Sequence, residues 1–335
     1  MTKKRTLLWL IPLILLILLI PFLVPSALPY AGAEELPVFS SVELANPSPE
    51  PVVLEPNPKY KNSMVSRYAP HKDAFTSEPL GYQDGTICVK IEKRTVVNGN
   101  GGKTAVYFTW VKIADPSQLR TSTNQPYPSK QLVAATSLAR RERSVLAING
   151  DYFCDRTEGI VYRNGELLRN SVFNTGYGYD ALIIDLNGNF HILLKPDPSD
   201  FKQYEGCIAH SFIFGPALVV DGKMQVLDGN NYASSPGMGL HKYLQRQAIC
   251  QMDNLTYLMI TAEGPEQSKD GGLTGQEMAQ LAYDCGAVQA YNLDGGSSSW
   301  LVLGTDRINA TRGKKRDIQD IIYFVTAEAD STPAE

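Results

Sequence analysis

Two short loops of this chain combine residue types that can do chemistry. The first is Asn292-Leu-Asp-Gly-Gly-Ser-Ser-Ser299, in which the carboxylate of Asp294 precedes two glycines and a run of serines. Glycines let backbone amides approach a ligand closely, and consecutive N–H groups can form a nest that binds an anion. A carboxylate beside such a nest suits a reaction with both an electrophilic carbon and an anionic group. The alternative is an ordinary Asp-Gly turn, and the position of the loop after a strand favours function.

The second loop is Asn149-Gly-Asp-Tyr-Phe153. An asparagine amide can donate to and accept from sugar hydroxyls, and aromatic rings can stack on a sugar face. The alternative is an Asn-Gly turn with Tyr152 and Phe153 in the core. This loop alone does not decide between the two interpretations.

Three further charged residues are candidates for the same chemistry. Arg246 stands at the entry to an apolar strand, and Arg316 stands just before the last predicted strand. Either guanidinium could offer a planar fork to a phosphate, although most arginines are surface charges. Glu263 follows a predicted strand and is a possible second carboxylate. His210 and His241 receive no role.

Several function classes are excluded by motif and composition. The chain has no GxSxG elbow, Walker loop or HExxH motif, and its four histidines lack metal-ligand spacing. We therefore predict neither a cofactor nor a metal, although oxygen ligands can bind calcium without a recognisable motif. A net charge of −4 argues against a nucleic-acid partner. The five cysteines would permit two disulfides in an exported chain, yet their apolar surroundings favour inert buried thiols.

The elements that position these residues are mainly short strands. Asn187-Gly-Asn189 predicts a hairpin between two of them, and Asp221-Gly222 follows a third. The strands are runs of β-branched and aromatic residues bounded by turn signals, at 104–113, 181–185, 190–194, 217–220 and 255–261.

Two helices are predicted between the strands. The first begins after Ser129 and places Leu132, Ala135 and Leu138 at helical spacing. The second begins at Thr274, because Thr274-Gly-Gln-Glu277 matches a capping box, and it stops at Gly286.

Each helix leads into a strand that ends in one of the two polar loops. Strand 255–261, helix 274–285 and strand 287–291 form a β-α-β unit, in which ligands gather at the carboxyl ends of strands. We therefore expect the loops after Asn149 and Asn292 to form one site. Since the helices are too few to cover both faces of a sheet, the predicted class is α+β, a strand-rich mixed-sheet domain.

The N-terminus predicts export. Lys3, Lys4 and Arg5 precede eighteen apolar or proline residues at 7–24, close to the ~20 that span a bilayer. We expect residues 1–33 to be a membrane anchor or, because Ala31-Gly-Ala33 resembles a cleavage site, a signal peptide. The remaining predicted parts are a proline-rich extracytoplasmic linker at 34–65, a folded domain at 66–327 and a polar tail at 328–335.

The order of motifs resembles the phosphodiester glycosidase family, which includes N-acetylglucosamine-1-phosphodiester α-N-acetylglucosaminidase and bacterial members described as exopolysaccharide-related. The resemblance covers roughly residues 85–326 and rests on five ordered blocks. These are Ala147-Ile-Asn-Gly-Asp-Tyr-Phe153, Phe214-Gly-Pro-Ala-Leu-Val-Val-Asp-Gly222, Arg246-Gln-Ala-Ile249, Gly272-Leu-Thr-Gly-Gln-Glu-Met-Ala279 and Tyr291-Asn-Leu-Asp-Gly-Gly-Ser-Ser-Ser299.

This resemblance implies hydrolysis of the bond between a sugar anomeric carbon and an esterified phosphate. The family usually has Gly where Asp151 stands, and Asp-Gly-Arg where Glu263-Gly-Pro265 stands. These two departures leave the substrate open. The positions that match the family's functional residues are Asn149, Gly150, Arg246, Thr274, Glu277, Asn292, Asp294, Gly295, Gly296, Ser297 and Arg316.

The mechanism that follows has Asp294 as base or nucleophile at the anomeric carbon, with Asp151 or Glu263 as the partner carboxylate. The departing phosphate would be received by Arg246, Arg316 and the backbone amides of Gly295, Gly296 and Ser297. We expect a glycan or sugar-phosphate substrate outside the cytoplasm, on envelope or exopolysaccharide glycans.

Two alternatives belong to other classes. One is a non-catalytic wall- or polysaccharide-binding module tethered to the membrane, and the other is a structural envelope protein with a large exposed apolar patch. The enzyme and the sugar-binding module both require one site formed by Asn149, Arg246, Asp294 and Arg316. If these residues lie far apart in the structure, both hypotheses fail.

Overall fold

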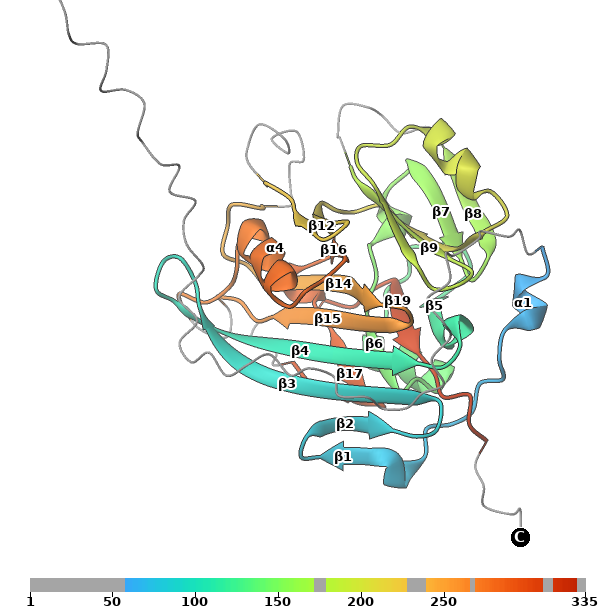
Figure 1. The fold of residues 1–335 in the computed structure, drawn as a ribbon, viewed down its shortest axis with the longest axis horizontal. Helices are drawn as coiled ribbons and strands as arrows, with labels where there is room; N and C mark the ends of the chain where they lie inside the picture. Colours follow the sequence, from blue (N-terminus) through green and yellow to red (C-terminus); the bar gives the residue numbers. More distant parts are fainter. Residues whose placement is uncertain (1–57, 172–178, 228–238, 266–268, 310–315, 330–335) are drawn as a thin grey trace, which may run out of the picture.

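The computed structural model describes residues 58–171, 179–227, 239–265, 269–309 and 316–329. The predicted strand-rich α+β fold is confirmed over these ranges (Figure 1). The apolar segment at 7–24 lies outside them, as does most of the predicted linker. No helix of the described ranges is long and apolar enough to cross a membrane.

The larger of the two main sheets has nine strands, and each strand pairs antiparallel with its neighbours. In order across the sheet they are β1 (Phe75–Ser77), β2 (Leu80–Gln83), β3 (Ile87–Val97), β4 (Lys103–Ile113), β15 (Thr256–Ala262), β14 (Arg246–Asp253), β16 (Gln289–Leu293), β12 (Ala217–Val220) and β13 (Lys223–Met224).

The second main sheet has five strands, also antiparallel. They are β18 (Asp306–Arg307), β17 (Leu301–Leu303), β6 (Leu146–Asn149), β19 (Asp320–Phe324) and β5 (Leu119–Thr123). Two smaller sheets hold β10 (Phe190–Leu193), β9 (Ala181–Asp185) and β11 (Ile208–Phe212), and β7 (Gly159–Arg163) with β8 (Glu166–Ser171).

The helices are α1 (Tyr60–Ser63), α2 (Ala135–Glu142) and α4 (Gly275–Asp284). Short 3-10 helices are η1 (Lys72–Ala74), η2 (Pro116–Gln118), η3 (Phe153–Asp155), η4 (Pro198–Tyr204) and η5 (Gly296–Ser298).

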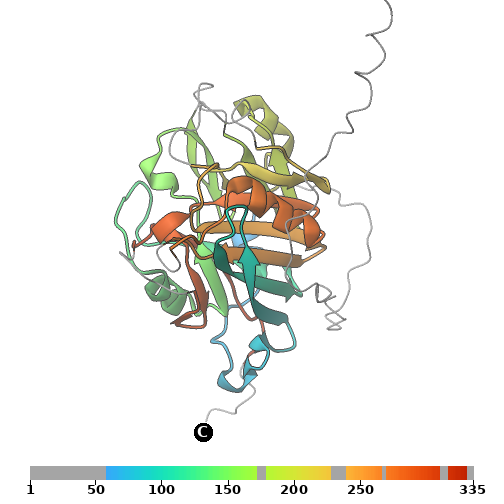
Figure 2. The same ribbon diagram turned by 90° about the vertical axis from the view of Figure 1, so that its left-hand side faces the viewer.

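The main core lies between the two large sheets. Ile249 and Met259 of the nine-stranded sheet pack in one cluster with Ile148 and Ile322 of the five-stranded sheet. Helix α4 covers the outer face of the nine-stranded sheet, and α2 covers the outer face of the five-stranded sheet. Figure 2 shows α4 lying across the strands of its sheet.

The structure confirms the predicted strands and corrects one helix. Residues after Ser129 do not start a helix, because Val133 exchanges two backbone hydrogen bonds of 2.9 Å with Ile318 and is held as an extended bridge. Helix α2 therefore begins only at Ala135. Tyr60 of α1, within the expected linker at 34–65, is buried.

The five cysteines form no disulfide, and all five thiols are buried: Cys88, Cys154, Cys207, Cys250 and Cys285. Burial raises the pKa of each thiol, so they remain protonated and inert in the folded state.

The two polar loops lie at matching ends of the two large sheets. Strands β15 and β16 run parallel to each other with β14 between them, so both end where β14 begins at Arg246. In the other sheet, β6 ends at Asn149 where β19 begins at Asp320. The fold therefore places the carboxyl ends of β6 and β16 together.

Candidate active site

The side chain of Asn149 joins the two loops. Its Nδ2 donates to the backbone carbonyl of Asp294 (2.7 Å) and to that of Gly150 (3.1 Å), and its Oδ1 accepts from the backbone N–H of Trp300 (3.0 Å). Asn149 is only 1% exposed, and both ends of its amide are used on the backbone. The structure thus gives Asn149 the task of fixing the Asp294 loop, with the amide directed away from solvent.

The Asp294 carboxyl lies in a partly dry environment between cations. Burial raises its pKa, while Ser298, the Arg316 guanidinium, the Gly295 amide and the Arg156 guanidinium oppose that rise. A carboxylate with a raised pKa beside two guanidinium groups fits a base or nucleophile that faces an anionic substrate.

Arg316 reaches this place from the segment before β19. Its guanidinium lies over the ring of Tyr152, 4.4 Å from the centroid, and its backbone carbonyl accepts from Trp300 Nε1 (3.0 Å). Tyr152 belongs to the Asn149 loop and has a left-handed backbone with φ 59°. Strain of this kind at a non-glycine residue is typical of functional sites.

Arg156 is the cation that sequence reasoning missed. It follows η3, donates to the carbonyl of Ile213 (2.7 Å) and lies over the rings of Tyr179 and Phe214 at 4.4 and 4.7 Å. A single arginine in a loop carries no motif, so only the fold of β11 and its following loop brings Arg156 towards Asp294.

Arg246 lies at the same sheet end but serves the backbone. Its guanidinium donates to the carbonyls of Leu273 (3.0 Å), Gly239 (2.6 Å) and Lys242 (2.9 Å). Burial lowers its pKa to about 10, against the opposing charge of Glu277. These bonds hold the segments before β14 and α4 in place, and they direct the fork of Arg246 towards carbonyl groups.

The glycines after Asp294 form a tight turn. A Cβ on Gly295 would lie 2.7 Å from the carbonyl oxygen of Gln245, and the N–H of Gly296 donates to that same oxygen (3.0 Å). Gly296 has φ +61°. The amide of Gly296 is therefore engaged within the protein, which leaves Ser297 as the better candidate for a ligand-binding amide of this turn.

Thr274 and Glu277 form the predicted capping box of α4. Thr274 Oγ1 accepts from the Glu277 N–H (3.2 Å), and Glu277 Oε2 accepts from the Thr274 N–H (2.7 Å). Glu277 Oε1 also accepts from the N–H of Gly99 (2.7 Å), which ties the β3–β4 turn to α4.

Asn292 faces the loop between β11 and β12. Its Nδ2 donates to the carbonyl of Gly215 (2.8 Å), while its buried Oδ1 has no hydrogen-bond partner in the described ranges. An unpaired acceptor of this kind is costly to bury. Because Asn292 is only 2% exposed, its side chain fixes the Gly215 loop and is not open to a ligand.

The two expected partner carboxylates lie in different surroundings. Asp151 has no exposed surface, and its oxygens accept from Arg163 Nη2 (2.6 Å) and the N–H of Ile213 (2.8 Å). It lies behind the site and presents no atom to solvent. Glu263 is 8% exposed at the end of β15, where its Oε1 accepts from the hydroxyl of Tyr107 (2.9 Å).

Gly150 leaves space for the carboxyl group of Asp320, a residue that belongs to none of the sequence motifs. A Cβ at this position would lie 2.2 Å from Asp320 Oδ2, so only glycine allows that contact. Asp320 is the first residue of β19, and an acidic residue that precedes an apolar run is the sequence signal that could have found it.

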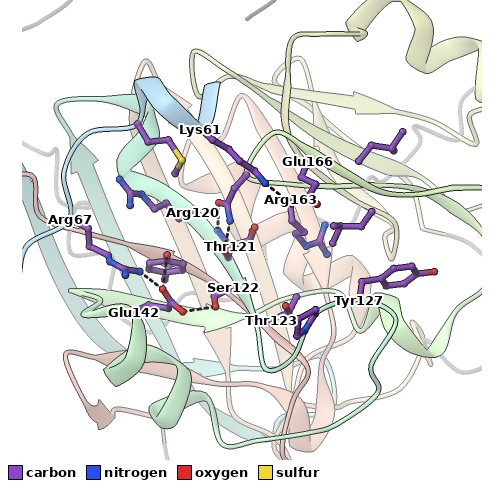
Figure 3. A pocket seen from close by; sticks show the side chains of 16 residues that line it. Lys61, Arg67, Arg120, Thr121, Ser122, Thr123, Tyr127, Glu142, Arg163 and Glu166 are labelled. Carbon is purple, nitrogen blue, oxygen red and sulfur yellow. Dashed lines mark hydrogen bonds and ion pairs between the residues drawn. The ribbon is translucent and has the colours of Figure 1, made fainter. Parts of the chain in front are cut away.

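A cavity of about 900 Å³ lies elsewhere, between α1, β5 and the β7–β8 hairpin (Figure 3). Its charged walls are paired internally, Lys61 with Glu166 and Arg67 with Glu142. The predicted chemistry-bearing residues do not line it. Arg163 does, and its guanidinium reaches from there to Asp151.

The two-sheet α+β fold thus carries a largely buried strand-end carboxylate in a loop that an asparagine side chain fixes. The profile of the phosphodiester glycosidases matches residues 142–325, and the chain belongs to this family. Membership indicates a glycosidase-type hydrolase and confirms the resemblance drawn from the five sequence blocks.

Two solved structures share the fold. The zebrafish N-acetylglucosamine-1-phosphodiester alpha-N-acetylglucosaminidase catalytic domain, auto-inhibited by its pro-peptide, aligns with a TM-score of 0.57 at 16% identity over 78% of this chain and 87% of that chain. A hypothetical protein from Synechocystis aligns with a TM-score of 0.50 at 16% identity over 72% and 62% of the two chains.

One curated relative is similar in sequence. The SPbeta prophage-derived uncharacterized protein YomE of Bacillus subtilis is 27% identical over 263 residues, which is 77% of this chain. The match spans 39% of the length of that protein.

Proposed function

We propose that this protein hydrolyses a sugar-1-phosphodiester, with Asp294 acting at the anomeric carbon. The bond between that carbon and the phosphate oxygen breaks, and its electron pair leaves with the phosphate. Water supplies the hydroxyl that the sugar gains. The observation that carries the proposal is the meeting of the two loops at the shared end of the sheets, where the Asn149 side chain bonds to the Asp294 backbone and the Arg316 guanidinium lies on the Tyr152 ring.

The leaving group explains why cations dominate this site. A phosphodiester leaves without prior protonation more readily than a sugar alcohol does, so the protein's main tasks are to steady positive charge at the sugar carbon and negative charge on the phosphate. The Asp294 carboxylate performs the first task. Arg316, Arg156 and the amide of Ser297 perform the second, and the Tyr152 ring offers an apolar face to the sugar.

The partner carboxylate in this proposal is Glu263, because Asp151 is fully buried. Arg246, Asn149 and Thr274 hold the backbone of the site, and Asn292 holds the Gly215 loop beside it. The residues 1–33 anchor or export the chain, so that the substrate is an envelope or exopolysaccharide glycan outside the cytoplasm.

The test uses the purified full chain and a panel of sugar-1-phosphodiesters. Asp294→Asn keeps the shape of the side chain and removes the charge, so kcat should fall at least about 1,000-fold with the circular dichroism spectrum unchanged. Asp306→Asn, an exposed aspartate of β18, is the matched control and should turn over like the wild type.

A tethered glycan-binding module predicts the opposite result. It would bind the sugar without releasing it, and binding would tolerate Asp294→Asn.

A further inference from the structure

Behind the Asn149 loop lies a buried cluster of two carboxylates and one guanidinium. Arg163 Nη2 donates to Asp151 Oδ1 (2.6 Å) and to Asp320 Oδ2 (3.1 Å). Asp151, Arg163 and Asp320 are 0%, 4% and 1% exposed. The cluster has two acidic groups for one cation in an environment that penalises net charge strongly.

Arg163 cannot leave this position easily. Its guanidinium lies between the rings of Phe153 and Phe212, 4.5 and 4.4 Å from their centroids. It also donates to the backbone carbonyls of Tyr162 (3.1 Å) and Ser211. The cation is therefore fixed, and the charge of the cluster can change only at a carboxyl group.

Of the two carboxyl groups, Asp320 is the one suited to hold a proton. Both oxygens of Asp151 face donors, with a 2.6 Å bond from Arg163 and a 2.8 Å bond from the Ile213 N–H. Within the described ranges, the Asp320 carboxyl receives only the longer bond from the guanidinium. Burial, followed by repulsion from Asp151 and Asp294 and opposed by Arg163, raises the pKa of Asp320 to about 7.

Asp320 is also coupled in space to the proposed catalytic carboxylate. Its carboxyl packs against Gly150, where a Cβ would lie 2.2 Å away, and the carbonyl of Gly150 accepts from the Asp294 N–H (3.4 Å). Only the backbone of one residue separates the cluster from the Asp294 loop.

We propose that Asp320 is a positioning residue whose proton keeps the buried cluster neutral behind Asp294, so that the site can accept a phosphodiester anion. When Asp320 loses this proton, the cluster gains a negative charge and repels the substrate. This inference rests on the proposed function and adds to it a device that ties substrate affinity to pH.

The other ionisable groups around the cluster do not provide the same control. Cys154 stays a thiol, because burial and the Asp320 charge raise its pKa to about 12. His210 stays neutral near pH 7, because burial and Arg163 lower its pKa to about 3. Arg156 and Arg316 lie on the Asp294 side and supply fixed positive charge. Asp320 is therefore the group whose charge changes near neutral pH.

Asp320→Asn tests the proposal, because the amide mimics the protonated carboxyl at every pH. With a turned-over sugar-1-phosphodiester, the wild-type KM should rise about fivefold between pH 6 and 9, a factor that one charge several ångströms away can produce. In Asp320→Asn the KM should be flat over this range, and in the control Asp306→Asn it should follow the wild type. A KM that rises equally in the wild type and in Asp320→Asn would overturn the proposal.

A second measurement needs no substrate and does not depend on the folding of Asp320→Asn. Carbon-13 labelling of the aspartate carboxyls in the wild-type chain should show one carboxyl titrating near pH 7, and its midpoint should fall in Asp294→Asn. An Asp320 carboxyl that is ionised throughout, or that ignores Asp294→Asn, would overturn the proposal. Absence of turnover together with the expected titration contradicts the proposed function alone.

Discussion

The carboxylate of Asp294 has to stay ionised in a partly dry site, where its charge depends on neighbouring guanidinium groups. Burial raises its pKa and the charges of Arg316 and Arg156 lower it. Arg246 lies at the same sheet end as the site but directs its guanidinium to three carbonyls, so it contributes to stability more than to phosphate binding.

This difference gives a paired prediction. Arg156→Met should raise the KM for a sugar-1-phosphodiester about tenfold or more, since a charge-assisted contact to phosphate is lost, and should lower the melting temperature less than Arg246→Met, since it removes one bond to a carbonyl and not three. Arg246→Met should lower the melting temperature by several degrees, because buried carbonyls lose their donors. Steady-state kinetics and thermal unfolding of the two variants check this. A large rise in KM for Arg246→Met together with an unchanged KM for Arg156→Met would contradict this prediction.

His210 predicts how stability depends on pH. Its Nδ1 lies 3.2 Å from the Asn164 N–H, which must donate to it, and its Nε2 lies 3.2 Å from the carbonyl of Leu119. A second proton would place two donors against each other. Because burial lowers the folded pKa to about 3, the His210 contribution is present above the unfolded value of 6.5 and is lost as pH falls below it.

Urea unfolding of the wild type and of His210→Gln checks this. The difference in free energy of unfolding between them should shrink by up to about 1.4 kcal/mol per pH unit between pH 6 and 4. His241→Gln, at an exposed position, is the control for the loss of an imidazole without the loss of buried contacts. A constant wild-type-minus-His210→Gln difference would contradict a neutral buried imidazole.

At the scale of elements, the start of α4 was readable from the sequence because its capping box is local. Thr274 and Glu277 satisfy each other's backbone groups without help from distant residues. The start of α2 was not readable, because Val133 is held by Ile318 from a strand far along the chain. Local patterns predicted β9, β12 and β4 for the same reason that they predicted α4.

Thr274→Ala tests whether Thr274 stabilises the protein by capping α4. The variant should lose about 1 kcal/mol of unfolding free energy, while Thr274→Ser, which keeps the hydroxyl, should lose much less. Chemical denaturation measures both. If Thr274→Ala unfolded like the wild type and only lost substrate affinity, Thr274 would be a ligand contact and its role as a cap would be refuted.

At the scale of the whole molecule, the site exists because two sheets end together. The sequence predicted that the Asn149 and Asn292 loops lie together. The hydrogen bond from the Asn149 side chain to the Asp294 carbonyl joins them. It could not predict that Asp151 turns inward, because this depends on Arg163 from a hairpin and Asp320 from the last strand. Long-range charge pairing leaves no periodic pattern in a sequence.

The central claim is that Asp294 catalyses release of a sugar from an anomeric phosphodiester. The most direct test is the rate of sugar release from such a substrate by the wild type and by a folded Asp294→Asn variant. The account predicts turnover by the wild type and at least about a 1,000-fold loss in the variant. Equal turnover by both proteins would contradict it.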